Sequence, residues 1–148
     1  MLRMAPVTAD PIEVANRLRP VLLQLNRELR REIHSLGVTG GQVALLIQIQ
    51  REPGLGVREL AARERMSPPG MSKYVGRLEA AGLVERSAVA DKRRIGLRLT
   101  EQGERVLRSV KKRRTAWLAA RLRELDPAER VAIERALEPL SRLLEMRL

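Results

Sequence analysis

The chain contains no cysteine and no phenylalanine, and its aromatic residues are a single tyrosine, Tyr74, and a single tryptophan, Trp117. The lack of cysteine excludes disulfides, metal sites with cysteine ligands, thiol nucleophiles and thiol redox switches. Proteins that bind single-stranded nucleic acids commonly stack the bases on aromatic side chains. The shortage of aromatic residues therefore argues against that class of binding protein.

Long apolar runs are missing too. No segment approaches the roughly 18 apolar residues of a membrane-spanning helix, and residues 1–20 lack the apolar core of a secretion signal. These absences predict a soluble, cytoplasmic protein without a membrane partner. The 148 residues suffice for one domain with its own core, with room for an oligomerisation element.

Motifs for catalysis and cofactor binding are also absent. The sequence has neither a phosphate-binding loop nor a dinucleotide fingerprint, and Gly40-Gly41 is typical of a helix start. The only histidine, His34, falls near Glu28 and Glu32 in an apolar-periodic segment. Such a histidine is more typical of a helix surface or core edge than of a catalyst or metal ligand. We therefore predict no enzyme, no cofactor and no metal site.

Positive charge is what the chain has in excess, with 29 Lys and Arg against 18 Asp and Glu and a net charge of +11. Residues 58–114 carry a net of +9, residues 1–57 carry +2, and residues 115–148 are neutral. A GC-rich genome explains a preference for Arg over Lys, but it does not concentrate charge in one segment. Segregated positive charge predicts a polyanionic partner, either nucleic acid or an acidic membrane surface.

Apolar periodicity predicts a long amphipathic helix near the N-terminus. Leucine and isoleucine recur at steps of three and four from Leu18 to Leu36. Asp10-Pro11 offers a cap followed by proline at the first helical position. Pro20 predicts either a kink or a later start near Arg19, and Gly37 is expected to end the helix.

Three shorter elements are expected next. Thr39-x-x-Gln42 is a capping box for a second helix, which Glu52-Pro53-Gly54 ends. A third helix is expected over residues 57–65, and Ser67-Pro68 begins a fourth that runs to Ala81. Two short helices separated by a tight turn predict a helix-turn-helix. The residues expected to be buried are Val43, Leu46, Ile49, Leu60, Ala61, Met71, Val75 and Leu78.

A hairpin and two further helices complete the predicted order. Residues 83–86 and 95–99 have the pattern of short strands, and a basic stretch from Ser87 to Arg94 joins them. A hairpin directly after a helix-turn-helix forms a winged helix. A long basic helix is expected from Thr100 to about Arg123, and Asp126-Pro127 caps a last helix. The apolar stripe of this last helix comprises Ile133, Ala136, Leu137, Leu140 and Leu144.

The fourth helix and the hairpin carry the candidate DNA-contacting residues. Gly70, Lys73 and Arg77 are spaced by three and four residues and share the helix face opposite the buried positions. Lysine and arginine can reach base acceptors or phosphates, and serine hydroxyls can bond phosphate. At the hairpin, Asp91 can orient an arginine toward a narrow minor groove. The predicted DNA-binding residues are Ser67, Pro68, Pro69, Gly70, Ser72, Lys73, Arg77, Asp91, Lys92, Arg93 and Arg94.

From Val57 to Gly103 the sequence resembles the winged helix-turn-helix of the MarR family of bacterial transcription regulators. The resemblance rests on the order and spacing of four strings, Glu59-Leu60-Ala61, residues 77–86 (RLEAAGLVER), Asp91-Lys92-Arg93 and residues 99–103 (LTEQG). It implies a homodimer whose two recognition helices read a pseudo-palindromic operator. It also implies a small anionic or aromatic effector in the crevice between the DNA-binding and dimerisation regions.

Individual roles follow from the same resemblance. Residues 68–77 would form the groove-entering helix with Ser72-Lys73 as its hydroxyl and basic pair, and Arg93 would enter the minor groove with Asp91 as its orienting partner. The chain departs from the family at two points. Only four residues separate Arg86 from Asp91 where five are common, and Lys73 stands where arginine is frequent. The shorter spacing affects how deeply Arg93 can insert into the minor groove. Lysine at position 73 is a point charge without the planar fork that lets arginine contact guanine through two hydrogen bonds.

The prediction is a mainly α protein with a small β-hairpin wing. Residues 39–103 form the winged helix-turn-helix domain, and residues 1–38 and 104–148 form the helical dimerisation region. The predicted function is a sequence-specific, ligand-responsive regulator of transcription that binds double-stranded DNA as a homodimer. A repressor is favoured because no separate activation domain is evident in the chain. Two alternatives stay open: an architectural DNA-binding protein without sequence specificity, and a membrane-surface protein that uses the basic run at residues 111–114 beside Trp117.

Overall fold

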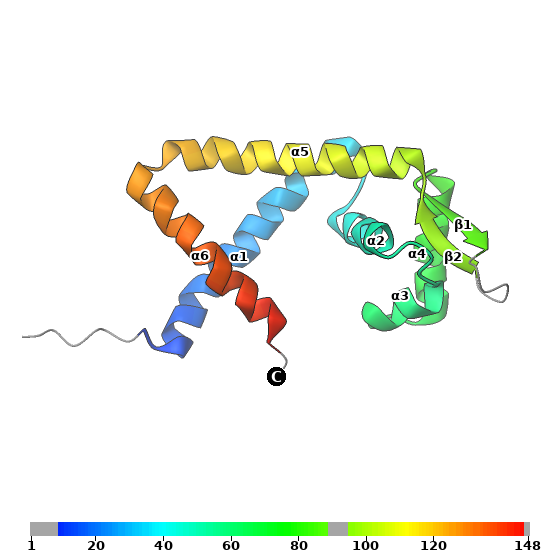
Figure 1. Ribbon diagram of the computed structural model, residues 1–148, viewed down its shortest axis with the longest axis horizontal. Coiled ribbons are helices and arrows are strands. Elements are labelled where there is room, and N and C mark those ends of the chain that lie inside the picture. Colours follow the sequence, from blue (N-terminus) through cyan, green and yellow to red (C-terminus); the bar gives the residue numbers. More distant parts are fainter. Residues whose placement is uncertain (1–8, 89–94, 147–148) are drawn as a thin grey trace, which may run out of the picture.

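The computed structural model describes residues 9–88 and 95–146. These ranges contain six α-helices, one short 3-10 helix and a two-stranded antiparallel sheet (Figure 1). The mainly helical fold with one small hairpin confirms the predicted fold class. No helix of these two ranges is both long enough and apolar enough to cross a membrane.

Three short helices and the hairpin form a lobe at one end of the molecule (Figure 1). Its helices are α2 (Gly40–Arg51), α3 (Val57–Arg63) and α4 (Pro68–Ala80). The capping box predicted at the start of α2 is present, with the Thr39 hydroxyl accepting from the Gln42 N–H at 3.1 Å. Strand β1 (Val84–Ala88) pairs with β2 (Ile95–Leu99), and Val84 lies opposite Leu99. We call this part of the chain, residues 39–103, the winged lobe.

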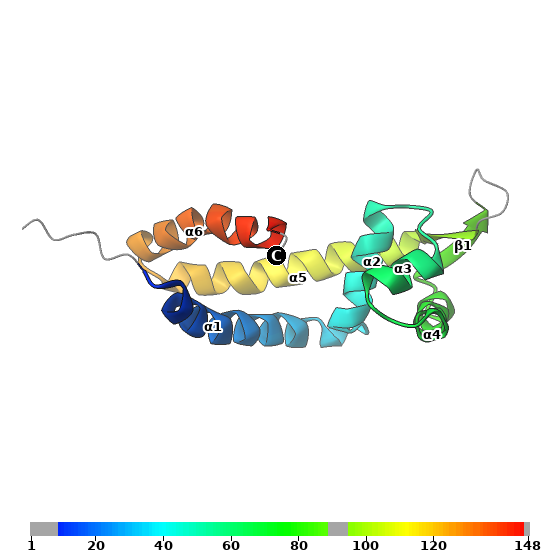
Figure 2. The ribbon, with the colours of Figure 1, turned by 90° about the horizontal axis from the view of Figure 1, so that it is seen from below.

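Two long helices and a third form an arm that extends from this lobe. Helix α1 (Pro11–Glu32) is followed by the 3-10 helix η1 (His34–Leu36), and the arm continues in α5 (Glu101–Glu124) and α6 (Pro127–Glu145). Helix α5 contacts both α1 and α2. Figure 2 shows α1 and α6 on opposite sides of α5. The arm is therefore tied to the lobe through α5.

The hydrophobic core lies in and beside the winged lobe. Every buried residue of the described ranges falls between Ile33 and Val110, and the predicted core positions are among them. Neither α1 nor α6 contains a buried residue, although both carry apolar stripes. The residues with 0% exposure are Ile33, Leu46, Ile49, Leu60, Met71, Val75, Leu78 and Leu97.

The structure decides one predicted helix start and corrects one predicted helix end. Helix α1 begins at Pro11 with the predicted cap, Asp10, and it continues through Pro20, so the alternative start near Arg19 is wrong. The proline ring removes one backbone donor, but this turn of α1 is exposed, so water can bond the freed carbonyl of Asn16. The α-helix ends at Glu32, before Gly37, which is left-handed with φ 76° and ends η1 instead.

The hairpin has a third member that the sequence did not reveal. Leu55 pairs with Leu97, with backbone bonds of 2.9 Å from Gly54 N–H to Leu97 C=O and from Leu97 N–H to Leu55 C=O. A Cβ atom on Gly96 would lie 2.5 Å from the Gly54 carbonyl oxygen, so only glycine fits there. This bridge fixes the base of the hairpin to the loop before α3.

Candidate nucleic-acid interface

The sequence of α4 accounts for where the helix begins and for which of its sides packs against the core. Ser67 caps it by accepting from the Gly70 N–H at 3.2 Å, and Pro68 supplies the first helical residue. Met71, Val75 and Leu78 each have 0% exposure and fasten one side of α4 to the core. The opposite side is consequently held toward solvent.

The predicted residues of α4 lie on this outward side. Gly70 is half-buried. A Cβ atom placed there would lie 3.0 Å from the Ser67 hydroxyl oxygen. Neither Lys73 nor Arg77 forms an ion pair with any residue of the described ranges. This surface therefore presents free cations and a hydroxyl group, Ser72, next to one another. The exposed residues of the predicted set are Ser67, Pro68, Pro69, Ser72, Lys73 and Arg77.

The wing part of the predicted site is not covered by the structure. Asp91, Lys92, Arg93 and Arg94 lie outside the described residues. The strands that lead to them are described and pair from Val84–Leu99 to Ala88–Ile95. The roles of these four residues remain predictions from the sequence.

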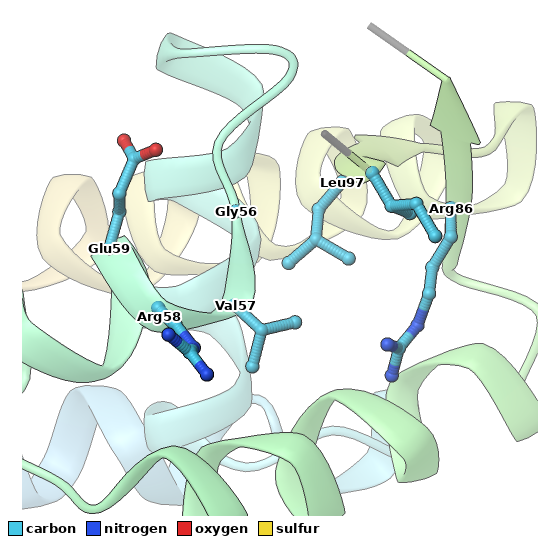
Figure 3. Close-up of a pocket in the computed structure, with 7 residues that line it drawn as sticks. Gly56, Val57, Arg58, Glu59, Arg86 and Leu97 are labelled. Carbon is cyan, nitrogen blue, oxygen red and sulfur yellow. The ribbon is translucent and has the colours of Figure 1, made fainter. Parts of the chain in front are cut away.

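A second group of arginines lies near the base of the hairpin (Figure 3). Arg58 and Arg86 line an open hollow of about 390 Å³, and Val57, Ile95 and Leu97 contribute apolar walls. Arg86 is held by Glu79 of α4, with 2.7 Å between Nε and Oε1. The sequence gives no sign that Arg58 and Arg86 lie near each other, because their proximity depends on the hairpin folding back toward α3.

Three consecutive charged residues at the turn between α3 and α4 have different surroundings. Arg63 pairs with Glu52 at 2.6 Å, and Glu64 accepts a hydrogen bond from the Gln48 side-chain amide. Arg65 is exposed and has a left-handed backbone with φ 53°. The sequence gives no local signal for Arg65, because the turn contains no glycine to mark a left-handed residue.

A crevice of about 330 Å³ separates α2 from α5, between the lobe and the arm. Burial and the neighbouring charge of Arg30 lower the pKa of Arg114, which lies at its edge. The Arg114 Nε–H is buried and has no hydrogen-bond partner among the residues that the structure describes. An unpartnered guanidinium donor favours a negatively charged occupant. The lining residues are Val43, Ile47, Gln50, Arg51, Leu107, Val110, Lys111, Arg114, Thr115 and Leu118.

The basic run at residues 111–114 is spread around α5 rather than gathered on one side. Lys111 and Arg114 line the crevice, whereas Arg113 donates to the Ser35 hydroxyl at 3.1 Å. Trp117 is covered by Arg121, whose guanidinium carbon lies 3.6 Å from the ring centroid. A membrane-surface helix needs its cations opposite a bulky apolar face. This arrangement does not provide one, which argues against that alternative.

Sequence comparison agrees with this geometry. Residues 36–95 match the family model described as MarR family. An HTH-type transcriptional regulator of Mycobacterium tuberculosis is 29% identical over 133 residues, which cover 89% of this chain and 93% of that protein.

Solved structures agree as well. A MarR family protein from Bacillus stearothermophilus is 29% identical, with a TM-score of 0.77 over 91% of this chain and 95% of the other. A transcriptional regulator structure from Pseudomonas aeruginosa is 30% identical, with a TM-score of 0.78 over 93% and 96% of the two chains. The chain belongs to the MarR family of DNA-binding, helix-turn-helix transcriptional regulators.

Proposed function

We propose that the protein is a ligand-responsive repressor that binds a pseudo-palindromic operator as a homodimer. The observation that carries this proposal is the outward side of α4, where Lys73 and Arg77 are exposed and free of ion pairs with described residues. Cations on a helix that protrudes from a winged lobe can contact base edges and phosphates in a major groove. Ser67, Pro68, Pro69, Gly70 and Ser72 complete the proposed surface on α4.

The proposed wing contact adds to the helix contact. Arg93 would enter the adjacent minor groove with Asp91 as its orienting partner, and Lys92 and Arg94 would bond the phosphates that flank it. The proposal is supported by the sequence position of these residues, which connect two strands that pair with each other.

Homodimerisation is supported by the apolar surface that α1 and α6 leave open. Leu23 is 59% exposed on α1, and Leu137 and Leu144 are 58% and 89% exposed on α6. An exposed apolar stripe of this extent on a helical arm is typical of an interface. Two copies joined through their arms would place two α4 helices on successive major grooves, about 34 Å apart.

Effector binding is supported by the crevice between α2 and α5. Its walls are aliphatic, and the unpartnered Arg114 Nε–H together with Arg51 and Lys111 makes it positive. A small aromatic carboxylate fits this combination, so benzoate is a suitable probe and uncharged benzamide a matched control. Benzoate should raise the melting temperature of the wild type by mass action. It should have no effect on Arg114→Gln, and equal shifts with benzamide would contradict an anion site.

Repression needs only that the dimer occupies the promoter, because a dimer bound there excludes RNA polymerase. We propose that this occurs in the cytoplasm, where bacterial DNA is transcribed. The alternative function is an architectural DNA-binding protein, for which the net charge of +9 over residues 58–114 would suffice.

Selection from a random-sequence duplex library separates the two functions. A homodimeric operator reader should enrich an inverted repeat with half-site centres about 10 base pairs apart, or a multiple of that spacing. Enrichment of no common sequence would contradict the proposed function and favour the architectural alternative. A template that carries the enriched repeat over its promoter should then lose transcription when the protein is added.

A further inference from the structure

Arg65 has a backbone conformation that arginine rarely adopts. Its φ is 53°, and it is the only residue other than glycine with positive φ in the described ranges. In this region Cβ crowds the following carbonyl oxygen, so glycine or asparagine fits with less strain than arginine does. The turn thus retains an arginine where folding alone would favour another residue.

No polar contact with the described residues explains why an arginine side chain stands at position 65. It is exposed and has no hydrogen bond or ion pair with the residues that the structure describes. Its two predecessors do have partners, since Arg63 pairs with Glu52 and Glu64 accepts from Gln48. Of these three consecutive residues, the strained one, Arg65, is therefore the one whose charge has no partner among the described residues.

The backbone around Arg65 holds it next to α4. The Arg65 N–H donates to the Ala62 carbonyl at 3.3 Å, and the Met66 N–H donates to the Ala61 carbonyl at 2.9 Å. Ser67, which follows at once, caps α4. Arg65 therefore lies within about 11 Å of the first helical residue, Pro68, as three Cα–Cα steps require.

We propose that Arg65 contacts a backbone phosphate at the edge of the major groove that α4 enters. This inference rests on the proposed function, because it needs the first turn of α4 in the groove. Contacts to phosphates fix the register of a recognition helix without reading bases, and the planar guanidinium suits them. The strain at Arg65 is consistent with such a role, since strained residues cluster at binding sites.

The test uses the full-length chain, a duplex enriched by the selection above and a scrambled duplex of the same length. Arg65→Asn removes the charge and keeps a side chain that tolerates left-handed backbone. Its melting temperature should equal or exceed that of the wild type. Each phosphate contact contributes about 0.9 to the slope of log affinity against log salt. Loss of one contact per protomer should lower that slope by about 1.8 and weaken binding about 30-fold at 0.15 M salt, on both duplexes.

Two control variants frame the result. Arg65→Lys keeps the charge and should stay within a few-fold of wild-type affinity, with the same salt slope. Arg142→Gln removes an exposed charge from α6, away from α4, and should leave the slope unchanged.

Three outcomes would overturn the proposal. These are an Arg65→Asn variant with wild-type affinity and slope, a loss confined to the enriched duplex, and an equal loss in Arg142→Gln. A wild type that binds no duplex would overturn the proposed function as well, and it is distinguishable because the failure precedes any substitution.

Discussion

The contact between the start of α5 and the loop that follows α4 depends on one glycine. A Cβ atom on Gly103 would lie 2.2 Å from the carbonyl oxygen of Leu83 and 3.1 Å from its carbonyl carbon. The same carbonyl accepts from the Thr100 N–H at 3.1 Å, and the Thr100 hydroxyl donates to the Gly82 carbonyl at 2.5 Å. Gly103→Ala must therefore move α5 away from the loop that follows α4.

The cost follows from these contacts. Overpacking against rigid backbone costs about 1–3 kcal/mol, and loss of the Thr100–Leu83 backbone bond adds about 0.5–1.5 kcal/mol. Gly103→Ala should accordingly lower the free energy of unfolding by about 1.5–4.5 kcal/mol. Because α5 carries the arm, the same shift should also change the relative placement of the two lobes in a dimer and weaken operator binding.

Gly76→Ala is the matched control. Gly76 is in the interior of α4. Apart from its chain neighbours and the adjacent helix backbone, no heavy atom of the described residues lies within 4 Å of a Cβ placed on it. Alanine should stabilise that helix by about 0.5–1 kcal/mol. Urea unfolding of both variants at one protein concentration, followed by circular dichroism, measures the two effects. A Gly103→Ala protein as stable as the wild type would refute the close approach of α5 to Leu83.

Four other predictions concern the site, the interface and pH. Lys73→Ala should narrow the ratio of affinities for the enriched and scrambled duplexes, whereas equal losses on both would make Lys73 a phosphate contact only. Arg93→Ala should cost about 1–3 kcal/mol of binding free energy in a gel-shift titration, and an unchanged affinity would mean that the shortened wing does not reach the groove. Leu137→Glu places a charge in the exposed stripe of α6, so light scattering should give a monomer mass near 16.7 kDa, against twice that for the wild type. The Glu129 backbone N–H donates to the Asp126 carboxylate at 2.9 Å and lowers the pKa of Asp126, so this cap stabilises α6 above the unfolded pKa of about 3.9 and is lost as pH falls through the lower folded value. The melting temperature of the wild type should therefore fall faster below about pH 4 than that of Asp126→Asn, and parallel curves would contradict this cap.

Local signals in the sequence were sufficient to predict most helix starts. Thr39 and Gln42 form the predicted capping box, and Ser67 and Asp126 cap their helices with proline in the first turn. These signals work because a cap depends on atoms three residues apart. Pro20 left two starts open for α1, and the start at Asp10-Pro11 is the correct one because an exposed helix turn tolerates the lost donor through hydration.

Features that join distant segments could not be predicted in this way. The closeness of Arg114 to Arg30 depends on how α1 packs against α5, and the Leu55–Leu97 bridge depends on how the loop after α2 packs against the hairpin. The outward face of α4 was predictable because its spacing is local. The strained turn at Arg65 was not, since the sequence contains no glycine to announce a left-handed residue.

The most direct test of the account is the ratio of dissociation constants for the enriched and scrambled duplexes, measured by competition at 0.15 M salt. An operator reader should prefer its enriched duplex by about 10³-fold or more. With about 6–10 phosphate contacts, its affinity should fall by about 10³–10⁵ between 50 and 200 mM salt. Equal affinity for the two duplexes would contradict sequence-specific regulation, and a flat salt response would contradict the assignment of the positive charge of residues 58–114 to DNA.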